Sequence, residues 1–200
     1  MPEVVHNDAL RFALIGLPGS GKSTVGRQLA RRLKIGFVDS DQVLERRLGC
    51  SIREFFEHVG EERFRDLEQQ VLDELTRTSA SSEPCVLSTG GGAVLRAANR
   101  TVLHQRCTVV YLRSSPEEIF RRLRHDKSRP LLQVADPLAR LRELYAQRDP
   151  LYRETAHFVI ETGRPSVATL VNMIVMQLEL AQPPSQSIAA ADTGAGAARS

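Results

Sequence analysis

The chain has 200 residues, of which 42% are hydrophobic and 26% charged, so it fits one compact domain and excludes a collagen-like or wholly disordered chain. Its net charge of +3 is too small to indicate a nucleic-acid ligand by itself. The first residues lack a secretory pattern, no apolar run is long enough to span a membrane, and the three cysteines are scattered. We therefore expect a cytoplasmic protein with no membrane partner.

Five short apolar runs alternate with segments of helical periodicity, which is typical of βαβ units and a parallel sheet. The predicted strands cover residues 12–15, 35–38, 85–88, 108–112 and 158–160. Helices are predicted after the first strand, over most of 41–80, from Pro116 with Ser115 as its cap, over 138–148, and from Pro165.

The ends of the chain differ from its middle. Residues 1–10 are expected to be an N-terminal extension and residues 11–180 a single domain. Residues 181–200 are rich in Pro, Ser, Gly and Ala and are expected to form a disordered tail.

The first predicted strand leads into a glycine-rich loop that matches the P-loop pattern G-x-x-x-x-G-K-S from Gly16 to Ser23. Its glycines let backbone amides surround phosphate oxygens, its lysine reaches the β- and γ-phosphates, and its serine hydroxyl can bind Mg²⁺. A predicted strand before the loop and a predicted helix after it supply the context that the motif requires. The residues expected to bind nucleotide here are Gly19, Ser20, Gly21, Lys22, Ser23 and Thr24.

The P-loop predicts a nucleoside triphosphate but says nothing about the acceptor. A switch GTPase should carry an Asn-Lys-x-Asp motif, which the sequence lacks. A motor or pump ATPase needs coupling modules, for which the chain is too short. A small-molecule kinase is the class that remains.

Asp39 and Asp41 follow the second predicted strand, at the edge of the sheet where open α/β proteins bind ligands. On extended chain their side chains would point the same way, so one could hold water on Mg²⁺ while the other meets an acceptor hydroxyl. The alternative is that Asp39 ends the strand and Asp41 caps the next helix. The glycines that follow the third strand allow close approach to a ligand or form a flexible turn; they are Gly90, Gly91 and Gly92.

Arg65 and Arg148 are candidates for binding a substrate carboxylate, because guanidinium groups bind carboxylates in a bidentate manner. Each could instead lie on a solvated helix face, and the sequence alone does not bring them together. The densest basic cluster, residues 121–129, suits either a nucleic-acid surface or a mobile segment that closes over the triphosphate. It lacks interleaved aromatic residues, which favours the second interpretation.

Together these motifs resemble those of the shikimate kinase family over residues 12–180. The resemblance rests on Gly-Leu-Pro-Gly-Ser-Gly-Lys-Ser at 16–23, Asp-Ser-Asp at 39–41, Gly-Glu-Glu-Arg-Phe-Arg at 60–65 with Glu68 beyond it, Gly-Gly-Gly-Ala-Val at 90–94, Arg-Pro-Leu-Leu at 129–132 and Arg-Asp-Pro-Leu-Tyr at 148–152. Gluconate and adenylate kinases share the phosphate loop and a lid, but they lack the combination of Asp-x-Asp, Phe-Arg and three consecutive glycines. The implied fold is a three-layer α/β P-loop fold. It has a five-stranded parallel sheet of order 2-3-1-4-5, a helical substrate-binding subdomain over about 41–80 and a mobile lid over about 123–135.

The resemblance also implies a reaction, the ATP-dependent phosphorylation of the 3-hydroxyl of shikimate on the pathway to chorismate and the aromatic amino acids. Asp41 would bind the hydroxyl that is phosphorylated, and Asp39 would reach Mg²⁺ through water. Arg65, Arg148 and the glycines at 90–92 would bind shikimate. Arg129 would reach the γ-phosphate from the lid, and Arg122 would stack on the nucleotide, with Arg124 as a rival.

Two alternatives remain open: a kinase of another small hydroxy acid, and a non-catalytic relative that binds nucleotide and acts through partners such as nucleic acid. A relative without activity should have lost Lys22, Asp41 or one of the two arginines, and all are present. We therefore predict a monomeric enzyme that uses ATP, Mg²⁺ and shikimate and has no nucleic-acid partner.

Overall fold

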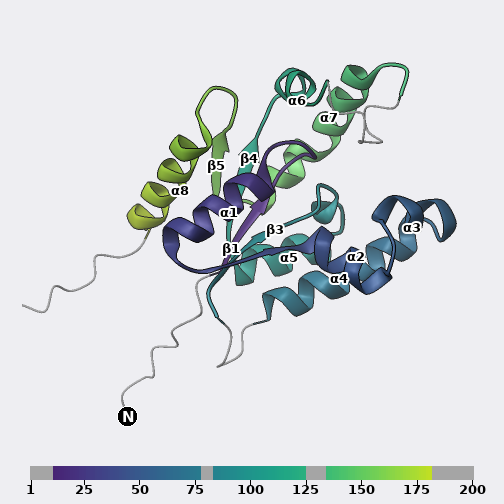
Figure 1. Cartoon of the computed structure of the whole chain (residues 1–200), viewed down its shortest axis with the longest axis horizontal. Coiled ribbons are helices and arrows are strands. Elements are labelled where there is room, and N and C mark those ends of the chain that lie inside the picture. Colours follow the sequence, from purple (N-terminus) through teal and green to yellow (C-terminus); the bar gives the residue numbers. More distant parts are fainter. Residues whose placement is uncertain (1–10, 78–82, 125–133, 182–200) are drawn as a thin grey trace, which may run out of the picture.

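A computed structural model describes residues 11–77, 83–124 and 134–181 of the chain (Figure 1). The predicted N-terminal extension, the central part of the predicted lid with Arg129, and residues 182–200 of the predicted tail lie outside the described residues.

The centre of the fold is a five-stranded parallel sheet of order β2-β3-β1-β4-β5. Its middle strand is joined to both neighbours in register, so that Ala13 pairs with Leu87 on one side and with Val109 on the other. The strand order is confirmed, and each strand lies within one residue of its predicted bounds: β1 (Arg11–Ile15), β2 (Gly36–Asp39), β3 (Cys85–Ser88), β4 (Thr108–Arg113) and β5 (Phe158–Glu161).

Helices cover both faces of this sheet, because side chains along each strand alternate between the two faces (Figure 1). Phe12 and Leu14 pack against α1 (Lys22–Leu33) and α8 (Val167–Ala181). Ala13 and Ile15 belong to the opposite core. The helices that line this second core are α4 (Glu61–Thr76), α5 (Ala97–Arg106), α6 (Pro116–Leu123) and α7 (Pro137–Thr155).

The predicted helical segment 41–80 is divided into α2 (Ser40–Leu48), α3 (Ile52–His58) and α4. Gly49 ends α2 with φ of 70°, and Ser51 starts α3 with a capping box that includes Glu54. Phe64 of α4 packs on Leu44 of α2 in a small core that also includes aromatic residues of α3. These three helices form one packed group (Figure 1), and α2 contacts the edge strand β2.

Two helix predictions at prolines are wrong. The helix predicted to end at residue 148 continues as α7 through Pro150 to Thr155. A proline inside a helix costs about 3 kcal/mol, and burial of Tyr152 in the core offsets a cost of that order. The last helix begins at Val167 rather than at Pro165, because Ser166 caps it by accepting a hydrogen bond from the Thr169 amide.

Helix α8 includes Ala181, the first residue of the predicted tail and one residue beyond the predicted end of the domain. No helix among residues 11–77, 83–124 and 134–181 is both long and apolar enough to cross a membrane.

Candidate active site

The phosphate loop connects β1 to α1 in a conformation that glycine makes possible. Gly19 and Gly21 have φ of 82° and 95°, a region that other residues rarely adopt. A Cβ atom on Gly19 would also lie 2.5 Å from Cδ1 of Leu123, so the loop passes close to α6. Lys22 donates hydrogen bonds from Nζ to the carbonyls of Gly16 at 2.8 Å and Leu17 at 2.9 Å. The ammonium is therefore held inside the loop, where a phosphate anion would bind.

Oxygen atoms from three chain segments meet beside this loop. Ser23 at the start of α1 donates from Oγ to Oδ2 of Asp39 at 2.7 Å, and its Oγ lies 3.3 Å from Oγ of Ser88 at the end of β3. Serine and carboxylate oxygens are ligands that suit Mg²⁺. Among the described residues, no group of three or more His, Cys, Asp and Glu side chains could hold a metal.

Asp39 and Asp41 face the same cavity, but not because they alternate along extended chain as predicted. The strand ends at Asp39, which caps α2 by accepting a hydrogen bond on Oδ1 from the Asp41 amide at 3.1 Å. Asp41 lies in the first turn of α2, so the capping residue is Asp39 rather than Asp41. The strand end and the helix start place both carboxyls in a cavity of about 220 Å³ that Lys22, Ser23 and Gly91 also line.

The Asp41 carboxyl is strongly perturbed. Burial, and next the negative charge of Asp39, raise its pKa from 3.8 to about 6, whereas the Lys22 ammonium acts in the opposite direction. Such a carboxyl is mostly ionised at neutral pH and gains a proton more readily than an ordinary aspartate. It can therefore accept a hydrogen bond or a proton from a bound hydroxyl.

Glycine is required at three consecutive positions because a side chain would not fit there, and not because of the backbone conformation. None of Gly90, Gly91 and Gly92 has a positive φ. A Cβ atom on Gly90 would lie 2.6 Å from Oδ1 of Asp41, and one on Gly92 would lie 2.3 Å from Nη1 of Arg65. At Gly91 the nearest atom would be Cδ of the phosphate-loop residue Pro18, at 2.6 Å. The segment thus lies between the phosphate loop, Asp41 and Arg65.

The structure brings the two candidate arginines to this same segment. Arg65 on α4 is 8% exposed and donates from Nη1 to Oε2 of Glu68 at 2.8 Å and from Nη2 to Oε1 of Glu61 at 2.7 Å. Arg148 on α7 donates from Nη1 to the Gly91 carbonyl at 3.1 Å, and its buried Nε has no hydrogen-bond partner among the described residues. An orphaned buried donor of this kind is a candidate ligand contact.

Glu68 follows the motif at residues 60–65 and lies in the site beside Arg65, although it is not among the predicted site residues. Its side chain is 1% exposed, and burial raises its pKa although Arg65 and then Arg148 lower it. The signal was its spacing of three residues from Arg65, which puts both side chains on one helix face.

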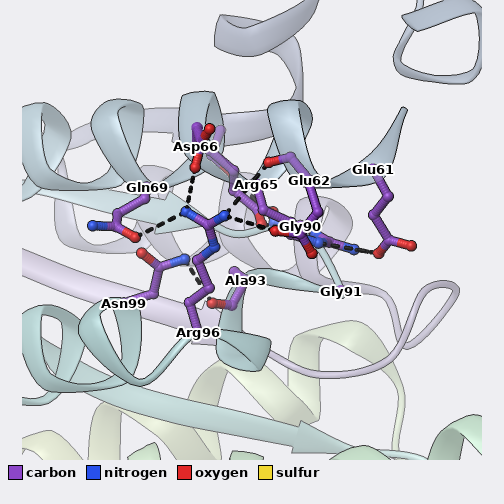
Figure 2. Close-up of polar contacts among 12 residues, drawn as sticks. Glu61, Glu62, Arg65, Asp66, Gln69, Gly90, Gly91, Ala93, Arg96 and Asn99 are labelled. Carbon is purple, nitrogen blue, oxygen red and sulfur yellow. Dashed lines mark hydrogen bonds and ion pairs between the residues drawn. The ribbon is translucent and has the colours of Figure 1, made fainter. Parts of the chain in front are cut away.

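Arg96, in the segment that follows the glycines, binds side chains of α4, as Figure 2 shows. Its Nη1 lies 2.8 Å from Oδ1 of Asp66 and 3.2 Å from Oε1 of Gln69. Just beyond it, the buried Asn99 donates to the Ala93 carbonyl at 2.9 Å. The glycine segment is therefore anchored on the helix that carries Arg65.

A second cavity, of about 290 Å³, also borders the phosphate loop. Gly19, Thr24 and Arg122 line it together with Thr162 and Leu170. Arg122 donates from Nη2 to the Thr162 carbonyl. Arg122 thus borders a cavity that the phosphate-loop residues Gly19 and Thr24 also line.

This fold and site define a P-loop kinase that acts on a small molecule, because the cavity beside the phosphate loop holds two carboxyl groups and the glycine segment at that cavity lies against two guanidinium groups. The family model described as shikimate kinase matches residues 18–179. The shikimate kinase of Paracidovorax citrulli is 64% identical over an alignment of 179 residues, which covers 88% of this chain and 97% of that protein. The shikimate kinase of Ralstonia nicotianae is 57% identical over an alignment of 176 residues, which covers 86% of this chain and 90% of that protein.

A solved structure agrees with these sequences. The shikimate kinase from Acinetobacter baumannii in complex with shikimate is 45% identical, with a TM-score of 0.79 over 86% of this chain and 94% of that one. The chain belongs to the shikimate kinase family. Its activity is the ATP-dependent phosphorylation of shikimate.

Proposed function

We propose that this reaction takes place between the phosphate loop and the glycine segment, with the shikimate 3-hydroxyl at Asp41 and the shikimate carboxylate at Arg65 and Arg148. The observation that carries the assignment is that all three side chains converge on residues 90–92. Asp41 lies against Gly90, Arg148 binds the Gly91 carbonyl, and Arg65 lies against Gly92.

The phosphates of ATP bind at the loop and at the start of α1. Lys22 contacts the β- and γ-phosphates, and the amides of residues 19–24 supply further donors at the positive end of the helix. Ser23 and Asp39 hold Mg²⁺, Asp39 through water, in agreement with their 2.7 Å contact. When bound, Mg²⁺ offsets negative charge on the phosphates.

Asp41 aligns the attacking hydroxyl. Its ionised carboxylate accepts a hydrogen bond from the hydroxyl and takes its proton during or after the transfer. Phosphoryl transfer asks mainly for alignment and charge neutralisation, so holding the hydroxyl in line with the γ-phosphate is the larger contribution.

The two arginines fix the opposite end of the acceptor. Arg65 is oriented by Glu68 and Glu61, and Arg148 by the Gly91 carbonyl, so both guanidinium groups are arranged before substrate binds. The unpartnered Nε of Arg148 would complete its hydrogen bonds on a substrate carboxylate.

The remaining assignments concern the nucleotide and the lid. Arg122 borders the second cavity and contacts the nucleotide there. Arg129 comes from the lid to neutralise charge on the transferring group. The monomeric state, the cytoplasmic location and the lack of a nucleic-acid partner stay predictions.

A coupled assay of ADP release tests the proposal. We expect turnover with shikimate and little with gluconate or quinate, because a pocket built from two preset arginines and Asp41 discriminates by hydroxyl arrangement. The Asp41→Asn variant serves as the control for ATP hydrolysis that does not depend on the acceptor. Equal rates with gluconate and shikimate would favour a kinase of another hydroxy acid.

A further inference from the structure

Two buried hydroxyl groups, from different helices, form hydrogen bonds with the backbone of the glycine segment. Oγ of Ser40 accepts a hydrogen bond from the Gly90 amide at 3.1 Å, and the Tyr152 hydroxyl donates to the Gly91 carbonyl at 2.6 Å. Ser40 and Tyr152 are both 0% exposed. Neither has a part in the reaction described above.

The segment needs such contacts because it has no side chains of its own. Three glycines in series leave the intervening peptide groups free to turn at little cost. The Gly91 carbonyl has two acceptor positions, and the second is used by Nη1 of Arg148 at 3.1 Å. A rotation of the peptide that follows Gly91 would therefore release Arg148 as well as alter the wall of the acceptor cavity.

Both hydroxyls are themselves firmly placed. Tyr152 follows Arg148 by one turn of α7, so its hydroxyl and the guanidinium reach the same carbonyl from one helix face. Its ring packs on Tyr111 with centroids 4.9 Å apart. Ser40 stands between Asp39 and Asp41 in the first turn of α2, so the helix that orients Asp41 also fixes the Gly90 amide.

We propose that Ser40 and Tyr152 are positioning residues for shikimate, which act by holding the peptide groups of Gly90 and Gly91 and, through the Gly91 carbonyl, Arg148. This inference rests on the proposed function, because it requires that Arg148 and the glycine segment bind the acceptor. ATP binds on the other side of the cavity, at the phosphate loop. Loss of either hydroxyl therefore affects the acceptor and leaves the nucleotide largely unaffected.

The test measures KM for shikimate, KM for ATP and kcat in Tyr152→Phe and Ser40→Ala. Each variant loses one hydrogen bond at the segment, so we expect KM for shikimate to rise roughly 5- to 15-fold. KM for ATP and kcat should stay within about twofold, since neither hydroxyl contacts the phosphate loop.

Tyr111→Phe is the matched control. It also removes the hydroxyl of a tyrosine with 1% exposure, but that hydroxyl donates to Oδ1 of Asp149 at 2.9 Å and not to the glycine segment. The control should keep the wild-type KM for shikimate. If it raises this KM as much as Tyr152→Phe does, general loss of packing explains the effect and the inference is wrong.

A double variant tests the path through Arg148. In the Arg148→Ala background, calorimetric titration with shikimate should show a smaller effect of Tyr152→Phe than in the wild type, because the two share one carbonyl. Unchanged shikimate affinity in Arg148→Ala alone would overturn the site assignment. If Arg148→Ala weakens shikimate binding but Tyr152→Phe and Ser40→Ala leave the shikimate affinity unchanged, only the positioning role is overturned.

Discussion

The hydroxyl of Ser23 donates a 2.7 Å hydrogen bond to Oδ2 of Asp39, although the strands that lead to these residues, β1 and β2, are separated in the sheet by β3. Ser88 at the end of β3 lies between them, 3.3 Å from the Ser23 hydroxyl. The ends of β2 and β3 and the start of α1 thus supply oxygen atoms to one point beside the phosphate loop.

Asp39→Asn should raise the Mg²⁺ concentration needed for half-maximal activity by roughly 10- to 100-fold, because it removes the negative charge that holds water on the ion. Asparagine also caps helices well, so α2 should keep its stability. The measurement is a titration of activity with MgCl₂ at saturating ATP and shikimate. An unchanged Mg²⁺ requirement would leave Asp39 with a capping role only.

Asp41→Asn should nearly abolish turnover while ATP binding is kept. The change is almost isosteric but removes the charge that aligns the hydroxyl or takes its proton. In the wild type, kcat/KM for shikimate should fall as pH drops through about 6, where Asp41 becomes protonated. Rate profiles from pH 5 to 8 and nucleotide titrations measure both effects, and wild-type kcat in the variant would rule out the role.

The ionised carboxylate of Asp41 should lower the free energy of unfolding, so its effect should depend on pH. Its pKa is raised on folding, from 3.8 to about 6, so the folded state disfavours the ionised form. The cost is absent below about pH 4, where the carboxyl is protonated in both states, and is complete above about pH 6. We expect Asp41→Asn to increase the free energy of unfolding at pH 8 by at most about 3 kcal/mol, and by little at pH 4. Denaturant unfolding at the two values measures the difference, and an equal effect at both would contradict it.

Arg65→Ala and Arg148→Ala should each weaken shikimate binding by roughly 10- to 150-fold, the effect of losing a charge-assisted hydrogen bond. An acceptor analogue without the carboxylate should bind poorly to the wild type and change little in the variants. Equal losses for the analogue and for shikimate would disprove the carboxylate contact.

The two arginine variants should differ in stability. Arg65→Ala leaves the buried Glu68 carboxylate without its ion-pair partner, which costs up to about 3–5 kcal/mol for a buried pair. The double variant Arg65→Ala/Glu68→Gln should recover most of this stability but not the affinity for shikimate. Thermal unfolding and calorimetry separate the two effects, and recovery of affinity would show that Arg65 acts only as a partner of Glu68.

Arg129→Ala should reduce kcat strongly, because a lid arginine contributes most as charge moves with the phosphoryl group. Cleavage by protease within residues 123–135 should slow when ATP and shikimate are both present. Tight, salt-sensitive binding of DNA or RNA, together with unimpaired turnover in the variant, would instead favour a nucleic-acid role for residues 121–129.

The sequence alone determined what depends on local pattern. The phosphate loop was predicted because its glycines, lysine and serine act within one continuous segment, and the strands because their apolar runs are short and bounded by turns. The periodicity of apolar residues does not predict the order of the strands in the sheet. That order follows from the family resemblance, which rests on several motifs together. Pro150 shows where local rules fail, since burial of Tyr152 keeps α7 continuous beyond it.

Only the tertiary structure decided how the distant parts of the site meet. Arg65 and Arg148 lie on different helices and are brought together at Gly91 and Gly92 by contacts between α4, α5 and α7 that no local pattern encodes. Other features of the site also depend on tertiary structure. They are the capping turn that directs Asp39 and Asp41 into one cavity, the burial of Glu68, and the hydrogen bonds of the Ser40 and Tyr152 hydroxyls. Each depends on which group from elsewhere in the chain reaches hydrogen-bond distance, and packing of the whole core fixes that distance.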